Sequence, residues 1–123
     1  AYIRAFFDRV KSINNTPDEI LNPFRTSVIN SFKAKSDDAI FKWGAKQAYL
    51  AMGNMLTVCA TQGVDACPME GFDPLEYDRF FKLNEKGLRS VLIMPIGYRA
   101  SDDMFAAMNK VRKPLSESII EVK

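Results

Sequence analysis

The longest patterned stretch of the chain runs from Ser36 to Gly63 and predicts one long helix. Ser36 is a suitable N-cap, because its hydroxyl can accept a hydrogen bond from an amide of the first turn. Asp37 and Asp38 place negative charge beside the positive end of the helix dipole, and Gly63 can adopt the left-handed conformation that ends a helix. Apolar residues cover most of the circumference, which is typical of a helix enclosed by protein, either in a monomer core or partly by a second subunit.

Two helical segments are predicted before this central helix. The first carries apolar residues at helical spacing, namely Ile3, Phe6, Phe7 and Val10. The second should start near Pro17, because Thr16, Pro17 and Glu19 have the spacing of a capping box with a first-turn proline. Pro23 is poorly suited to a helix interior, so we expect a short helix to about Leu21 and a separate piece from Phe24 to Phe32.

Two helix start signals follow the central helix. Asp73 and Pro74 combine a cap with a first-turn proline and predict a helix from Pro74 to about Leu83. Residues 84–87 then form a turn. The run Ser101-Asp102-Asp103 repeats the signal found at residues 36–38 and predicts a helix to about Met108. Paired carboxylates after a serine are typical of a helix cap, so a metal site there is the weaker interpretation.

The strand signals are few. The one strong signal lies within 88–98, where Val91–Met94 is a continuous apolar run that suggests a strand covered on both faces. Pro95 should interrupt its pairing because proline has no amide hydrogen. Residues 64–67 and 118–122 are weaker candidates for short extended segments. A covered strand needs hydrogen-bonded neighbours, so we expect further strands from polypeptide upstream or from another chain.

Composition narrows the possible functions. With 123 residues, 47% hydrophobic and 26% charged, the chain fits one globular domain, and a net charge of +2 does not favour nucleic-acid binding. The absence of histidine excludes Ser-His and Cys-His nucleophile systems and most zinc sites. Cys59 and Cys67 lack the spacing of a zinc or redox motif, so a reduced, cytoplasmic setting is expected. The polar residues of the central helix argue against a membrane span.

The segment from Gly63 to Pro74 carries the most chemical information. It predicts a strand end, a tight turn and a helix N-terminus, a place where backbone amides are left without partners in the fold. Pro68 fixes the backbone and offers a flat apolar face, and Gly71 lets a ligand approach the main chain. Taken from these residues alone, a structural turn is the favoured interpretation.

Two motifs change that balance. The order W-x-x-K-Q-x-Y-L-x-x-G-N over 43–54 and G-x-D-x-x-P-M-E-G-F-D over 63–73 resembles the FMN-dependent nitroreductase family. Residues 86–88, 95–99 and 110–114 follow in the order and spacing of that family. The resemblance implies that 1–123 is a single partial domain, the C-terminal half of an α+β fold of the α-β-α type. Its long central helix and flanking helices would cover part of a sheet that a missing N-terminal half and a partner subunit complete.

The resemblance also implies a cofactor site. Pro68 and Met69 would lie at the flavin, with Pro68 against the isoalloxazine ring. The backbone amides of Glu70 and Gly71 would face flavin N5 and O4, where amide donors stabilise the negative charge of the reduced ring. Glu70 would therefore act through its main chain.

Basic and aromatic residues supply the remaining candidates. Lys110 and Arg112 would bind the FMN phosphate, although from these residues alone a solvated basic turn is favoured. Phe24 and Phe32 are candidates for the substrate pocket, although core packing is the favoured interpretation for both. No catalytic side chain and no metal ligand are expected.

The implied activity is transfer of hydride from NAD(P)H through flavin N5 to a nitroaromatic, quinone or related acceptor in a ping-pong cycle. The implied assembly is a homodimer formed through the central helix and a C-terminal arm at 118–122. Two alternatives remain open. The chain could be an inactive truncated piece that supplies only dimer contacts, or a flavin protein of the same fold with other chemistry, such as dehalogenation or flavin cleavage.

Overall fold

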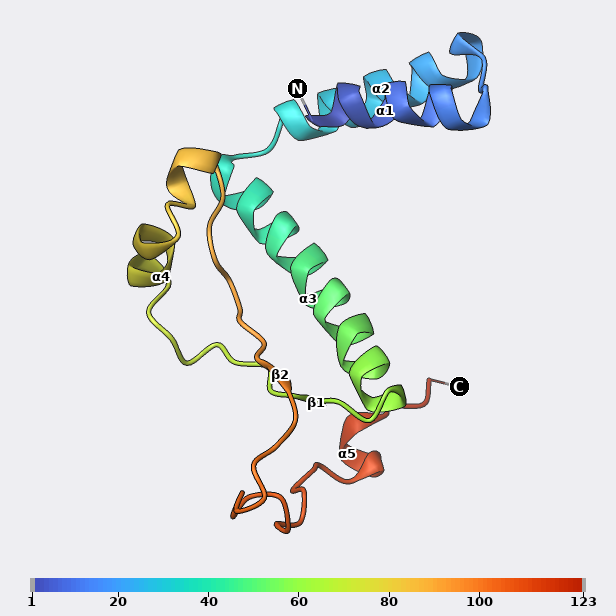
Figure 1. Cartoon of the computed structure of the whole chain (residues 1–123). Coiled ribbons are helices and arrows are strands. Elements are labelled where there is room, and N and C mark those ends of the chain that lie inside the picture. The colour runs from blue at the N-terminus through green and yellow to red at the C-terminus, as the bar shows by residue number, and fades with distance from the viewer. Residues whose placement is uncertain (1, 123) are drawn as a thin grey trace.

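The computed structural model of the chain describes residues 2–122 and is mostly helical, with one small sheet. A helical hairpin lies beyond the N-terminal end of one long helix, and the polypeptide after that helix runs back along it before a C-terminal tail turns away (Figure 1). In chain order the elements are α1 (Tyr2–Asn14), α2 (Asp18–Lys33), α3 (Asp37–Thr61), β1 (Asp65–Ala66), α4 (Pro74–Phe80), the 3₁₀ helix η1 (Asn84–Lys86), β2 (Ile96–Gly97) and α5 (Leu115–Ser118).

The hairpin of α1 and α2 is held together by a small aromatic cluster. Phe7 is buried, and its ring meets those of Phe6 and Phe24 edge-on, with centroids 5.5 and 5.4 Å apart. Leu21 is the other buried apolar residue of the hairpin. An ion pair of 2.5 Å between Lys11 Nζ and Asp18 Oδ2 spans the turn. The helix predicted around Ile3 to Val10 is therefore confirmed.

The predicted break at Pro23 is wrong, because α2 continues through this proline to Lys33. The predicted capping box is also wrong, since Pro17 occupies the N-cap position and no side chain caps the helix. A proline in a helix leaves the carbonyl four residues earlier without its donor. That carbonyl belongs to Glu19, which is exposed and can be hydrated, while Phe24 gains the contact with Phe7. Packing against α1 thus offsets the local cost of Pro23.

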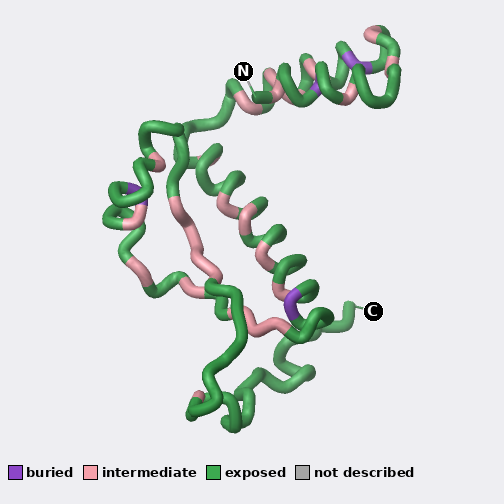
Figure 2. The backbone as a smooth tube through the Cα atoms, viewed as in Figure 1, coloured by how far each residue is buried: buried purple, intermediate pink, exposed green. Residues whose placement is uncertain are grey.

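The long helix α3 has the predicted limits. The hydroxyl of Ser36 accepts a hydrogen bond from the amide of Ala39 at 3.2 Å, and Gly63 has a φ of +65°. Only Cys59 is buried in α3, near its C-terminal end, and most of the helix is exposed (Figure 2). The predicted enclosure of this helix is therefore not provided by the residues that the structure describes.

The sheet is an antiparallel pair in which Asp65 lies opposite Gly97 and Ala66 opposite Ile96. Pairing extends past the strands, since Cys67 donates to the carbonyl of Pro95 at 3.1 Å. Met69 and Ile93 then exchange two hydrogen bonds of 2.9 and 3.0 Å. Pro95 cannot return a bond to Cys67, so the predicted lapse in pairing occurs at this residue.

The strand expected within 88–98 is confirmed, since β2 lies there, but its pairing over the apolar run 91–94 is limited and it is not covered on both faces by the described residues. In this run only Ile93 takes part in an isolated bridge, and all four residues are half-buried. This run is bridged along one edge only, to Met69. A strand covered on both faces also needs a neighbouring strand on its other edge and packing on each face, and the described residues supply neither. The strand assignment falls instead on Ile96 and Gly97.

Helix α4 starts as predicted and ends three residues early, at Phe80 rather than Leu83. Asp73 Oδ1 accepts hydrogen bonds from the amides of Leu75 and Glu76 at 2.9 and 3.1 Å. The chain leaves the helical conformation at Lys82, whose φ is 53°. Asp78 is buried and accepts a bond of 2.7 Å from the amide of Ser90, which ties α4 to the extended segment that follows.

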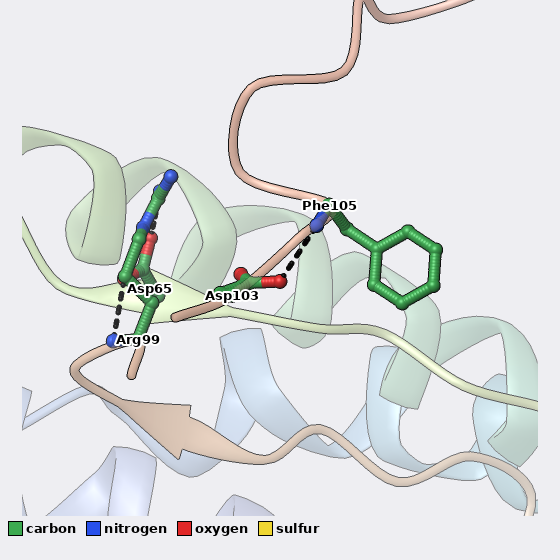
Figure 3. A network of polar contacts seen from close by, with 4 residues as sticks. All are labelled: Asp65, Arg99, Asp103 and Phe105. Atoms are coloured by element: carbon green, nitrogen blue, oxygen red, sulfur yellow. Dashed lines mark hydrogen bonds and ion pairs between the residues drawn. The ribbon is translucent and has the colours of Figure 1, made fainter. Parts of the chain in front are cut away.

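Two predictions for the C-terminal part are wrong. Residues 101–108 form turns instead of a helix, and the described residues of 118–122 form no strand. Asp103 Oδ1 accepts a hydrogen bond of 2.9 Å from the amide of Phe105, so a start signal is present (Figure 3). Met104, Phe105 and Met108 are exposed, however, and a short helix needs an apolar face to pack. Among the described residues no helix is both long and apolar enough to cross a membrane.

Candidate functional site

The segment from Cys67 to Phe72 is held on both sides of Glu70. Before it, the main chain of Met69 is fixed by its two hydrogen bonds with Ile93. After it, the amide of Phe72 donates to the carbonyl of Glu70 at 2.9 Å, which closes a three-residue turn around Gly71. The amides of Glu70 and Gly71 donate to no acceptor within residues 2–122. The turn therefore presents two neighbouring donors that this part of the chain does not use.

A cavity of about 410 Å³ lies against this turn. It is lined by Tyr49, Met52, Pro68, Met69, Glu70 and Leu92. Four of these side chains are apolar, and the two polar ones bond to each other, because the Tyr49 hydroxyl donates to Glu70 Oε1. A flat apolar ring that needs hydrogen bonds along one edge is a ligand that such a cavity and two free amides can accept.

The sequence analysis did not assign Tyr49, Met52 or Leu92 to the site. A signal was present for two of them, because Tyr49 and Met52 are three residues apart within the 43–54 motif and so share one face of α3. Leu92 carries no such signal. Its place at the cavity follows from the pairing of Met69 with Ile93, which a single sequence does not show.

Gly71 is not required by the fold of the described residues. Its φ is not among the positive values, and a Cβ added there would meet nothing within 4 Å. A side chain at this position would therefore be tolerated by the backbone while standing beside the free amides. This arrangement fits a glycine kept for close approach of a ligand to the main chain.

An ion pair joins two of the sequence motifs next to this turn. Asp65 Oδ2 accepts bonds from Arg99 Nε at 2.9 Å and from the Arg99 amide at 3.0 Å, and Arg99 Nη2 donates to the other carboxylate oxygen (Figure 3). The hydrogen bonds from Arg99 lower the pKa of Asp65 from 3.8 to about 2. The pair fastens β1 to the residues after β2 and so holds the strand that leads into Pro68.

The comparison with known families decides what these motifs belong to. The profile described as "Nitroreductase family" matches residues 20–98, which include the central helix, the turn and the Met69–Ile93 bridge. The chain belongs to the nitroreductase family. Its fold is a partial α+β nitroreductase-like fold, because a nitroreductase family protein from Streptococcus pneumoniae has a similar structure, with a TM-score of 0.75 at 22% sequence identity. That likeness covers 98% of this chain and 57% of the other.

Curated relatives in the nitroreductase family support the same assignment. An "Oxygen-insensitive NAD(P)H nitroreductase" of Salmonella typhimurium is 43% identical over 81 residues, which are 66% of this chain and 37% of that protein. A protein of the same name from Enterobacter cloacae is 42% identical over 87 residues, 71% of this chain and 39% of that protein. The chain thus spans less than two-fifths of the length of these two relatives.

The other predicted site residues of this nitroreductase-family chain lie apart from the turn. Lys110 and Arg112 are exposed, lie beyond the matched residues, and form no ion pair with an acidic side chain within 2–122. The Arg112 guanidinium donates to the carbonyl of Val111 at 2.9 Å. No hydrogen bond or ion pair of the described residues joins either cation to Pro68–Gly71, and their role at a phosphate stays a prediction.

Phe32 lies at the end of the hairpin. Its ring meets Trp43 edge-on, with centroids 5.0 Å apart, and Lys35 Nζ lies 5.7 Å from its centroid. It lines a separate apolar cavity of about 740 Å³ between the hairpin and the first turns of α3. Its contact with Trp43 favours packing, and the predicted substrate role is untested.

The Asp65–Arg99 pair gives this nitroreductase-family fold a defined acid response. Because the folded-state pKa of Asp65 lies below its unfolded value, the stabilisation is present above pH 3.8 and is lost as the pH falls toward about 2. We expect Asp65→Asn to reduce the pH dependence of the free energy of unfolding in this window. Denaturant unfolding at several pH values checks this, and an Asp65→Asn profile parallel to that of the parent would contradict the assignment.

Proposed function

We propose that this chain is the C-terminal half of a homodimeric, FMN-dependent oxidoreductase. The enzyme would take hydride from NAD(P)H and deliver it to a nitroaromatic, a quinone or a related acceptor. The observation that carries the proposal is the pair of unused amides at Glu70 and Gly71, which stand beside an apolar cavity in the segment shared with the nitroreductase family. The names of the two NAD(P)H nitroreductase relatives agree with this chemistry.

The residues at the cavity fit a flavin ring. Pro68 would offer its flat face to the ring, while the Glu70 and Gly71 amides would donate to acceptors along the ring edge. Lys110 and Arg112 would bind the phosphate at the other end of FMN. The flavin, when bound, supplies hydride acceptance and donation.

The chain contributes orientation and electrostatics to that chemistry. Amides fixed by the Met69–Ile93 bridge and by the Phe72 bond can stabilise developing negative charge without rearranging. Met52, Pro68 and Leu92 add an apolar lining against which the ring could pack. No side chain of the cavity is needed as an acid or base, because the flavin would itself accept and donate the hydride.

A partner subunit would cover the apolar surface that this chain leaves open. Trp43, Leu50, Met55 and Val58 of α3 are exposed although they are large and apolar. Large apolar side chains left exposed along one helix fit an interaction site better than a solvent-facing surface. We therefore place the homodimer contacts along α3, with residues 118–122 as the arm that crosses to the partner.

A second candidate is an inactive piece that supplies only contacts. One observation in its favour is the small number of buried apolar residues within 2–122, which are Phe7, Leu21 and Cys59. Another is that the chain covers less than two-fifths of the length of the two curated relatives. Such a chain would have the fold elements of the family without holding FMN.

Flavin content and turnover separate the candidates. We expect the purified protein to be yellow, to contain FMN, and to oxidise NAD(P)H when a nitroaromatic acceptor is added. A colourless protein of 13.9 kDa that binds no added FMN would support the inactive piece. Bound FMN without nitroaromatic reduction, but with dehalogenation or cleavage of flavin, would favour the same fold with other chemistry.

A further inference from the structure

Tyr49 provides a connection between the long helix and the turn that carries the free amides. Its hydroxyl donates to Glu70 Oε1, so a side chain of α3 is joined to a residue 21 positions further along the chain. The ring of Tyr49 also lines the 410 Å³ cavity together with Pro68 and Leu92. The bond therefore lies at the edge of the proposed cofactor site.

The main chain around Glu70 is fixed at two other points. Met69 is bonded through both its amide and its carbonyl to Ile93, and the Glu70 carbonyl accepts from the amide of Phe72. These bonds limit where the peptide units can move, but they leave the Glu70 side chain free to turn. The Tyr49 hydroxyl removes that freedom and adds a third point, on the side of α3.

The chemistry of the pair keeps the Tyr49 hydroxyl protonated, so that it can donate this third bond. The hydrogen bond to Glu70 and the nearby carboxylate raise the pKa of Tyr49, since an ionised phenol would lose the bond and face a second negative charge. Tyr49 thus remains a protonated donor under ordinary conditions. The Glu70 carboxylate is in turn held toward α3 by this donor.

We propose that Tyr49 is a positioning residue, which aims the Glu70 and Gly71 amides at the cofactor by holding the Glu70 side chain against α3. This inference rests on the proposed function. It assigns to Tyr49 an effect on FMN affinity and on the redox potential of bound FMN, because both depend on how well the amides meet the ring. It assigns no proton transfer to either side chain.

Tyr49→Phe tests the inference in the intact FMN-binding protein, because it removes the hydroxyl and keeps the ring that lines the cavity. A net hydrogen bond contributes about 0.5–1.5 kcal/mol, so we expect the FMN dissociation constant to rise roughly two- to tenfold. The midpoint potential of bound FMN should fall, because less well-aimed amides stabilise the reduced flavin less. The unfolding midpoint of the FMN-free protein should stay the same, since the bond is solvent-exposed.

Two further variants separate positioning from loss of structure. Glu70→Gln keeps an oxygen that can accept the hydrogen bond from Tyr49, so it should retain most of the FMN affinity. Glu70→Ala removes that acceptor and should weaken FMN binding as Tyr49→Phe does. Adding Tyr49→Phe to Glu70→Ala should cost nothing more if the two residues act as one unit. Tyr98→Phe is the matched control, because the Tyr98 side chain is 83% exposed and its hydroxyl makes no hydrogen bond within residues 2–122.

The outcomes are distinct. Weaker FMN binding in Tyr49→Phe, rescue by Glu70→Gln and no further loss in the double variant would support the inference. A Tyr49→Phe protein with unchanged affinity and potential would overturn it and leave the proposed function standing. An unfolding midpoint of the FMN-free protein that falls in step with affinity would show a structural role and overturn it as well. A parent protein that binds no FMN overturns both.

Discussion

Replacing Gly71 with valine is expected to weaken FMN binding roughly ten- to hundredfold, because a branched side chain beside the amide blocks its hydrogen bond to the ring. The fold itself should tolerate the change. The backbone at Gly71 does not have a positive φ, and a Cβ there would meet no atom of the chain within 4 Å. Fluorescence titration of the FMN-free protein gives the dissociation constant, and thermal unfolding of the same sample reports the fold.

Gly97→Val is the matched control for this experiment. Gly97 lies in β2, and a Cβ added there also meets nothing within 4 Å. Since no role at the cavity is assigned to Gly97, its substitution should leave FMN affinity as in the parent. If Gly71→Val binds FMN as tightly as Gly97→Val, the contact between the main chain and the ring is misplaced.

Apart from the capping box expected at Thr16, which does not form, the helix caps around α3 and α4 were predictable from the sequence because they depend on neighbouring residues. The Ser36 and Asp73 side chains bond to amides two or three residues away, so the signal and its partner lie in one short stretch. Gly63 adopts the predicted left-handed conformation for the same local reason. These residues fix the start of α4 and both ends of α3, the helix that carries Tyr49 and Met52.

Where prediction failed, contacts distant in sequence decided the outcome. Pro23 stays inside α2, where Phe24 packs on Phe7 of α1. Residues 101–108 have a start signal but remain turns, because their large apolar side chains meet no partner among the described residues. The run Val91–Met94 has strand composition, yet it is bridged at one residue because a strand also requires neighbours.

In the candidate site too, the residues that were predicted depend on local sequence and those that were missed depend on distant contacts. The turn at Pro68–Gly71 was predicted from its own residues together with the family motif, and its two unused amides are observed. Tyr49 and Leu92 were missed because they reach the cavity through α3 and through the Met69–Ile93 bridge. The ion pair between Asp65 and Arg99 was also missed, although both residues lie in family motifs. Spacing along the chain does not reveal which charged side chains pair in the fold.

Arg112→Ala is expected to raise the dissociation constant of FMN roughly ten- to hundredfold, since a hydrogen bond to a charged group contributes about 1.5–3 kcal/mol. The guanidinium has no acidic partner within residues 2–122, so its removal should leave the unfolding midpoint unchanged. Riboflavin, which has the same ring system and lacks the phosphate, should bind the variant and the parent equally. Titration of both proteins with both ligands measures these four affinities.

Lys113→Ala is the control for Arg112→Ala, because it removes a neighbouring exposed cation to which no role at the phosphate is assigned. If Arg112 forms directed bonds to the phosphate, its loss should affect FMN far more than the loss of Lys113 does. If both variants weaken FMN binding by equal, small amounts and the effect vanishes at high salt, these cations attract the phosphate only through their overall charge. An equal loss of FMN and riboflavin affinity would place Arg112 at the ring or in the fold, and would remove it from the phosphate.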